Sequence, residues 1–185
     1  RSTPKPSSAA SDVYKRQFRG EPMKILHRMA ALGSLKTAEP GTIEGVAVPY
    51  NQFSSVIHGE QPRPFRERIK RGALSWDAST SMFVQHDRSG VPLARVGAGT
   101  LSLSDTSAGV MFKANIPTAR QDVVEALERG DLDGSVSIGF IVEETEYEHF
   151  ESQSIRDVTA GHIVEISLVS QGAYPQASGT FNPGD

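Results

Sequence analysis

The shortness of the apolar segments is the feature that most constrains how this chain can fold. Thr42–Pro49 ends at turn-favouring residues, and the runs Arg95–Ser104 and Gly109–Ile116 are joined by Asp105–Ala108, which favours a hairpin turn. The other candidate strands are Phe65–Ile69, Ser81–His86, Ser135–Glu143, Ser154–Thr159 and His162–Ser170. Strands this short cannot bury both faces alone. The pattern therefore predicts a mainly β protein with a few helices and a barrel-like sheet.

One segment has the periodicity of an amphipathic helix. Val123, Val124, Ala126 and Leu127 form an apolar stripe, with charged residues on the opposite face. Thr118 is the expected N-cap, and Gly130 is expected to end the helix.

The length of 185 residues suits one domain with a substantial core. The first stretch is rich in serine, proline and basic residues, and Met23 then resembles a natural start. We interpret residues 1–22 as a non-native or disordered segment, with a genuine flexible arm as the alternative. The expected domain spans residues 23–178, and residues 179–185 form a flexible tail.

Charge and composition argue against several functions. The formal net charge is −3, so there is no basic footprint that would predict binding to nucleic acid. No apolar run is long enough to span a bilayer. The chain has no cysteine, which removes disulfides, thiol nucleophiles and cysteine-ligated metals. We expect no cofactor, no nucleic-acid partner and no membrane association.

Three strand-like segments carry polar residues suited to catalysis. His86 ends an apolar run, Ser135 and Ser137 share one face of a candidate strand, and Glu165 interrupts another apolar run. A buried carboxylate is costly unless it is paired, and an imidazole is a natural partner. A serine hydroxyl becomes a good nucleophile only beside a base that a third group orients. Such a trio, taken alone, is weak evidence for catalysis.

The order of the motifs adds a resemblance. The segments are GTIEGVAVPYN, RIKRGAL, FVQHDRSGVPLARVGAGTLSLSDTSAGVMFKANIP, DVVEALERGDLDGSVSIGF and HIVEISLVSQGAYPQA. Together they resemble the tailed-phage prohead (capsid maturation) serine proteases, whose fold is related to that of herpesvirus assemblin. The resemblance runs from about Gly41 to Ala177.

The resemblance implies a role for each residue of the trio. Ser137, before Ile-Gly-Phe, corresponds to the nucleophile, His86 to the general base, and Glu165 to the third member that orients the base. Assemblin-type enzymes have an arginine-bearing segment after the third member, and this chain has none there. Backbone N–H groups near Gly172 and Ala173 are our candidates for the oxyanion hole.

The resemblance also implies substrates and a setting. The expected activity is cleavage of scaffold and capsid-protein extensions, and of the chain itself, inside an assembling prohead in the infected bacterial cytoplasm. A homodimer is plausible by analogy with assemblin.

Other interpretations remain open. Ser135 is the rival nucleophile, or a strand hydroxyl bonded to a neighbour. Asp87 begins a turn or orients the imidazole, His162 is a structural histidine, and His27 has no partner that the sequence identifies. His86, Asp87, His162 and Glu165 could instead form a zinc site of a metal-dependent hydrolase, although no helical ligand spacing supports one. A non-catalytic capsid or scaffold assembly module of the same fold is the other alternative.

Overall fold

The computed structural model describes residues 24–30, 41–149 and 154–170. The expectations for residues 1–22 and 179–185 lie outside these ranges. The same is true of the proposed oxyanion-hole groups near Gly172 and Ala173. Among the described residues, the structure contains no helix with the length and apolarity needed to cross a membrane.

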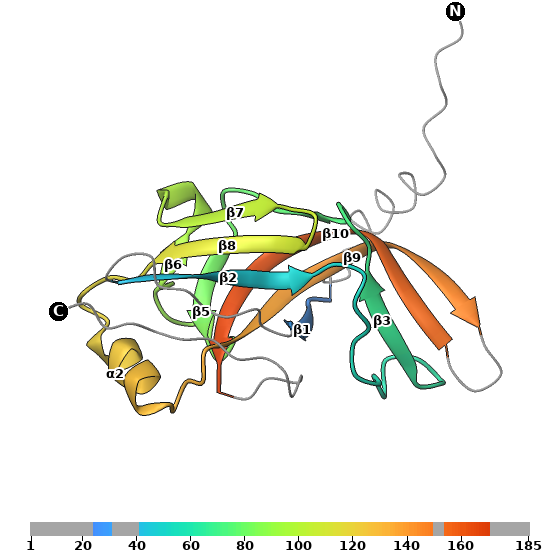
Figure 1. Cartoon of the computed structure of the whole chain (residues 1–185), viewed down its shortest axis with the longest axis horizontal. Helices are drawn as coiled ribbons and strands as arrows, with labels where there is room; N and C mark the ends of the chain where they lie inside the picture. Colours follow the sequence, from blue (N-terminus) through green and yellow to red (C-terminus); the bar gives the residue numbers. More distant parts are fainter. Residues whose placement is uncertain (1–23, 31–40, 150–153, 171–185) are drawn as a thin grey trace, which may run out of the picture.

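The strands form two sheets, which cross one another in Figure 1. The larger sheet has the path β1 (Leu26–Ala30), β9 (Ser135–His149), β10 (Ser154–Val169), β5 (Ser81–Val84) and β6 (Ala94–Arg95). β3 (Phe65–Ile69) and β4 (Leu74–Ser75) also pair with β10, in parallel. The smaller sheet has the order β2 (Thr42–Pro49), β8 (Gly109–Asn115) and β7 (Leu101–Asp105).

One hydrophobic core joins the two sheets. Its buried side chains include Ile43 of β2 and Phe112 of β8, together with Val136, Ile138 and Phe140 of β9. Successive side chains of a strand point to opposite faces, so the odd-numbered residues of this part of β9 lie on the other face. The burial of alternate apolar residues therefore fixes which face presents the two serines of β9.

The prediction of a mainly β protein with few helices is confirmed, but closure into a barrel is not. No backbone pairing links the larger sheet to the smaller one among the described strands. Two sheets whose edges are not hydrogen-bonded to each other form a packed pair rather than a closed barrel.

The predicted helix is present and ends where expected, but its N-cap residue was predicted wrongly. α2 spans Gln121–Arg129, and η1, a short 3₁₀ helix, spans Val96–Ala98. Thr118 is not the N-cap; Arg120 occupies that position and makes no side-chain capping hydrogen bond. Gly130 ends the helix as predicted, with a left-handed φ of 78° that glycine adopts readily.

Strands β9 and β10 are longer than the sequence pattern indicates. β9 continues through the acidic stretch to His149, and β10 runs unbroken where two strands were expected. The two strands pair with each other from His149–Ser154 to Ser135–Val169, with register shifts along the way. This pairing satisfies the backbone groups of a polar segment, so the strand needs no apolar alternation there.

Candidate active site

The strand register gathers the polar residues on one face of the larger sheet. Glu165 of β10 lies opposite Gly139 of β9, and Gly139 in turn lies opposite His27 of β1. Ser137 lies opposite Ser167 of β10. Directly paired residues share a face, and residues two apart along a strand do too. Ser137 therefore stands one pleat repeat, about 6.8 Å, from the row that contains Glu165.

His86 reaches this face from the loop after β5. Gln85 and His86 have positive φ angles of 52° and 60°. The loop is held because the Gln85 N–H donates to the Leu168 carbonyl oxygen at 2.8 Å, and the Asp87 N–H donates to that of Val84 at 3.0 Å. Two successive left-handed residues without glycine are uncommon, and such conformations cluster at functional sites.

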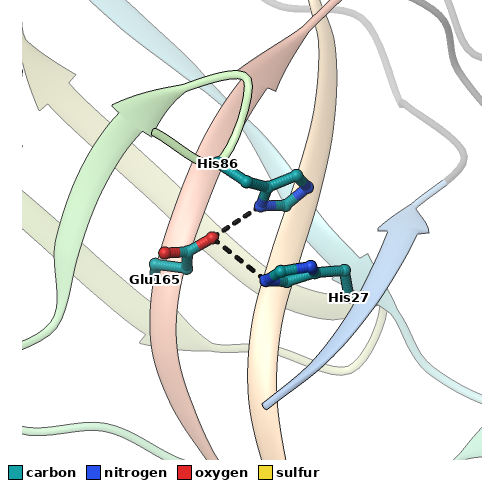
Figure 2. Close-up of side chains that lie close together, drawn as sticks. All are labelled: His27, His86 and Glu165. Atoms are coloured by element: carbon teal, nitrogen blue, oxygen red, sulfur yellow. Dashed lines mark hydrogen bonds and ion pairs between the residues drawn. The ribbon is translucent and has the colours of Figure 1, made fainter. Parts of the chain in front are cut away.

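His86 and Glu165 form a short hydrogen bond. The Nδ1–H of His86 donates to Oε1 of Glu165 at 2.5 Å (Figure 2). The Glu165 side chain is 0% exposed, and its Oε2 lies 3.3 Å from Nε of Arg88. With Nδ1 directed at the carboxylate, Nε2 of the same ring is the nitrogen left to accept a proton. This is the orientation that a general base needs.

Gly139 provides the space that the carboxylate occupies. A Cβ atom at this position would lie 2.6 Å from Cγ of Glu165 and 3.1 Å from its Oε1. Real Cβ contacts are essentially never shorter than 3.0 Å. The glycine of the Ser-Ile-Gly-Phe segment is therefore required by the close approach of Glu165 from the neighbouring strand.

The serines of this face are buried. Ser135 is 1% exposed, and Ser137 and Ser167 are 0% exposed. Their hydroxyl oxygens have no hydrogen-bond partner among the described residues, which is unusual for buried polar atoms. The alternative role of the Ser135 hydroxyl, a hydrogen bond to a neighbouring residue, is therefore not seen among the described residues. The structure joins His86 to Glu165 and places Ser137 on the same sheet face without closing a bond between Ser137 and His86.

His27 is a site residue that the sequence did not identify. Its ring stacks on that of His86, with centroids 4.0 Å apart and planes inclined by 21°. Its Nε2 lies 3.5 Å from Oε1 of Glu165, so both imidazoles face the same carboxylate oxygen (Figure 2). Burial lowers the pKa of His27, the neighbouring His86 lowers it further, and Glu165 opposes both effects. The mixed sequence around His27 carries no strand signal, which is why β1 was missed.

Two other candidates have partners elsewhere. Nδ1 of His162 lies 3.0 Å from Oγ of Ser75, and its Nε2 lies 3.5 Å from Oδ2 of Asp77. Asp87 accepts hydrogen bonds from the backbone N–H and the hydroxyl of Ser89, at 2.9 Å and 2.6 Å. Asp87 therefore forms a turn. Neither residue joins the cluster around Glu165.

The geometry of the cluster is that of a hydrogen-bonded pair. The described residues include one group of three potential metal ligands, His27, His86 and Glu165, whose ligand atoms lie within 4.8 Å of one another. Two ligands of a tetrahedral zinc ion, with bonds of about 2.0–2.1 Å, would be about 3.3 Å apart. Nδ1 of His86 and Oε1 of Glu165 are only 2.5 Å apart. The alternative zinc set of His86, Asp87, His162 and Glu165 is not brought together, because His162 lies against Ser75 and Asp77.

An imidazole whose Nδ1–H is bonded to a buried carboxylate is the arrangement by which serine hydrolases orient their general base. The family model described as caudovirus prohead serine protease matches residues 30–182. The chain belongs to the caudovirus prohead serine protease family, and the resemblance seen in the sequence is confirmed. Neither the curated proteins nor the solved structures include a match.

Proposed function

We propose that this chain is a serine endopeptidase in which Ser137 is the nucleophile, His86 the general base and Glu165 the residue that orients the base. The observation that carries the proposal is the 2.5 Å hydrogen bond from His86 Nδ1–H to Glu165, on the sheet face that also holds Ser137. Membership of a serine protease family supports the same reaction.

The proposed reaction follows from the position and protonation of Ser137, His86 and Glu165. Nε2 of His86 accepts the hydroxyl proton as Ser137 Oγ attacks the scissile carbonyl, and Glu165 stabilises the resulting imidazolium. His86 then gives the proton to the departing amine, which leaves an ester between the substrate and Ser137. Water, deprotonated by His86, hydrolyses the ester and regenerates the hydroxyl. Backbone N–H groups near Gly172 and Ala173 remain our candidates for stabilising the oxyanion.

Substrate access requires a local change in structure. Ser137 is 0% exposed and its hydroxyl has no hydrogen-bond partner among the described residues. Attack on a peptide requires that Ser137 becomes accessible and that its Oγ rotates toward His86. Catalytic hydrogen bonds are often long or poorly aligned in the free enzyme and shorten when substrate binds.

The proposed substrates are scaffold protein, extensions of the major capsid protein, and the chain itself. Cleavage would take place inside the assembling prohead, in the infected host cytoplasm. The family description supports the prohead as the setting. The proposal includes self-association as a homodimer, and no nucleic-acid or membrane partner.

The test is to express the chain together with its phage capsid and scaffold proteins and to follow their processing by gel electrophoresis and mass spectrometry. Ser137→Ala should abolish processing. Ser135→Ala, which removes a buried hydroxyl from the same strand face, is the matched control and should retain it. Unchanged processing by Ser137→Ala would refute the assignment. Absence of processing by the wild type would favour a non-catalytic assembly module.

A further inference from the structure

We propose that His27 is a positioning residue, which holds the His86 ring against Glu165 by stacking on the ring and facing the same carboxylate oxygen. This inference rests on the proposed function of His86 and Glu165. Two contacts carry it: the ring centroids are 4.0 Å apart, and His27 Nε2 is 3.5 Å from Oε1 of Glu165.

The need for such a residue arises from the loop that carries His86. This loop follows a strand of four residues, and Gln85 and His86 both adopt a left-handed conformation, which is costly for residues other than glycine. A histidine side chain can rotate about two torsion angles. The hydrogen bond to Glu165 fixes one edge of the ring, and the His27 ring covers one face. Together they limit rotation and keep Nε2 available on the other side.

The strand that carries His27 is firmly anchored. The adjacent residue, Arg28, donates from Nε to Oε1 of Glu67 and from Nη2 to Oε2 of Glu60, both at 2.8 Å. Arg156 of β10 binds the same two carboxylates, with its Nε 2.7 Å from Oε2 of Glu67. Glu67 and Arg156 are 3% and 5% exposed. This largely buried network ties β1 to β3 and β10, so the backbone position of His27 in β1 is fixed.

The charge of His27 suits the role. Partial burial lowers its pKa, and His86, Arg88 and Arg28 lower it further, whereas Glu165 raises it. The lowered pKa favours the neutral form of the His27 ring at pH 7. A neutral ring can stack on His86 while that ring becomes an imidazolium, whereas a charged one would repel it and compete for Glu165.

The experiment compares substitutions of His27 that keep an aromatic ring, keep only a polar group, or keep neither, so that the effect of ring stacking can be distinguished. His27→Phe keeps a ring, His27→Gln keeps a polar group without a ring, and His27→Ala keeps neither. His149→Ala, at an exposed histidine outside the site, is the control. For each variant, kcat and KM are measured on a peptide that contains the processing site. NMR of the His86 Nδ1–H proton, which resonates far downfield in a short bond to a carboxylate, is recorded in a Ser137→Ala background.

We expect kcat to fall about tenfold to a hundredfold in His27→Ala and His27→Gln, with KM little changed, as is typical of a misplaced catalytic group. The Nδ1–H signal should broaden or disappear in these two variants through faster exchange with solvent. His27→Phe should retain most of kcat and the signal. An unchanged kcat and signal in His27→Ala would overturn the proposal, as would equal losses in all three variants, which indicate a structural role only.

The two proposals can fail separately. The NMR comparison uses protein that already lacks the Ser137 hydroxyl and needs no peptidase activity. If Ser137→Ala still processes substrate, the proposed nucleophile is wrong, yet the effect of His27 on the His86–Glu165 hydrogen bond is still measured. If Ser137→Ala is inactive and the His27 variants are normal, only the role of His27 is refuted.

Discussion

Replacing Gly139 by alanine tests the geometry of the site with a single methyl group. The new Cβ atom would lie 2.6 Å from Cγ of Glu165 in the present arrangement. Gly139 does not have a left-handed φ, so backbone strain does not contribute. The variant therefore reports on the contact with Glu165 and on little else.

The size of the effect follows from the contact distance. Ordinary van der Waals contact begins at 3.4 Å, so the two atoms must separate by about 0.8 Å, the difference between 3.4 and 2.6 Å. Overpacking of this kind costs about 1–3 kcal/mol of unfolding free energy. A displacement of this size would lengthen the 2.5 Å hydrogen bond to His86 to as much as about 3.3 Å, and a misplacement approaching 1 Å lowers the rate about 10²-fold.

The assay combines unfolding by denaturant, steady-state cleavage of a processing-site peptide, and the NMR signal of the His86 Nδ1–H proton. Gly90→Ala is the matched control, because Gly90 lies in the loop after His86 and a Cβ there meets nothing within 4 Å. If Gly139→Ala cleaves the peptide within about threefold of the wild-type rate and keeps the downfield signal, Glu165 does not occupy the position described.

Two further predictions concern stability. Glu67→Gln leaves Arg28 and Arg156 with Glu60 as their shared carboxylate, so one positive charge of this largely buried network is no longer compensated. The unfolding free energy should therefore fall by about 3–5 kcal/mol in denaturant titrations, and a loss below about 1 kcal/mol would contradict this. Arg68 and Lys70 lower the pKa of Asp157, so its stabilising effect is present above the unfolded pKa, about 3.9, and is lost as pH falls through the folded pKa. The difference in stability between wild type and Asp157→Asn should therefore be largest near neutral pH and shrink in acid, and a pH-independent difference would refute it.

The ion pairs and the catalytic candidates share one structural element. β10 carries Arg156 and Asp157 at one end and Glu165 further along, and it pairs with β9, β3, β4 and β5. A strand hydrogen-bonded on both sides has little freedom to move, because each shift would break several backbone hydrogen bonds. Glu165 is thus fixed by the sheet, whereas His86 lies on a loop and depends on side-chain contacts for its orientation.

Several features could be read from the sequence because their signals are local. Short apolar runs predicted β2, β3 and the hairpin that ends in β8, and Gly130 predicted the end of α2. The first strand of that hairpin was expected over Arg95–Ser104, whereas β7 begins only at Leu101 and η1 precedes it. The carboxylate of Glu165 within an apolar run indicated a paired, buried group, and the structure supplies His86 as that partner. These predictions depend on residues whose neighbours in the chain already define their environment.

Other features depend on contacts between segments far apart in the chain. β1 and the polar end of β9 have no apolar period of their own, and pairing with neighbouring strands makes them regular. The stacking of His27 on His86, the space that Gly139 leaves for Glu165, and the burial of Ser137 all follow from the register of β1, β9 and β10. A shift of one residue turns every side chain of a strand to the opposite face, so only the paired sheet determines which residues meet.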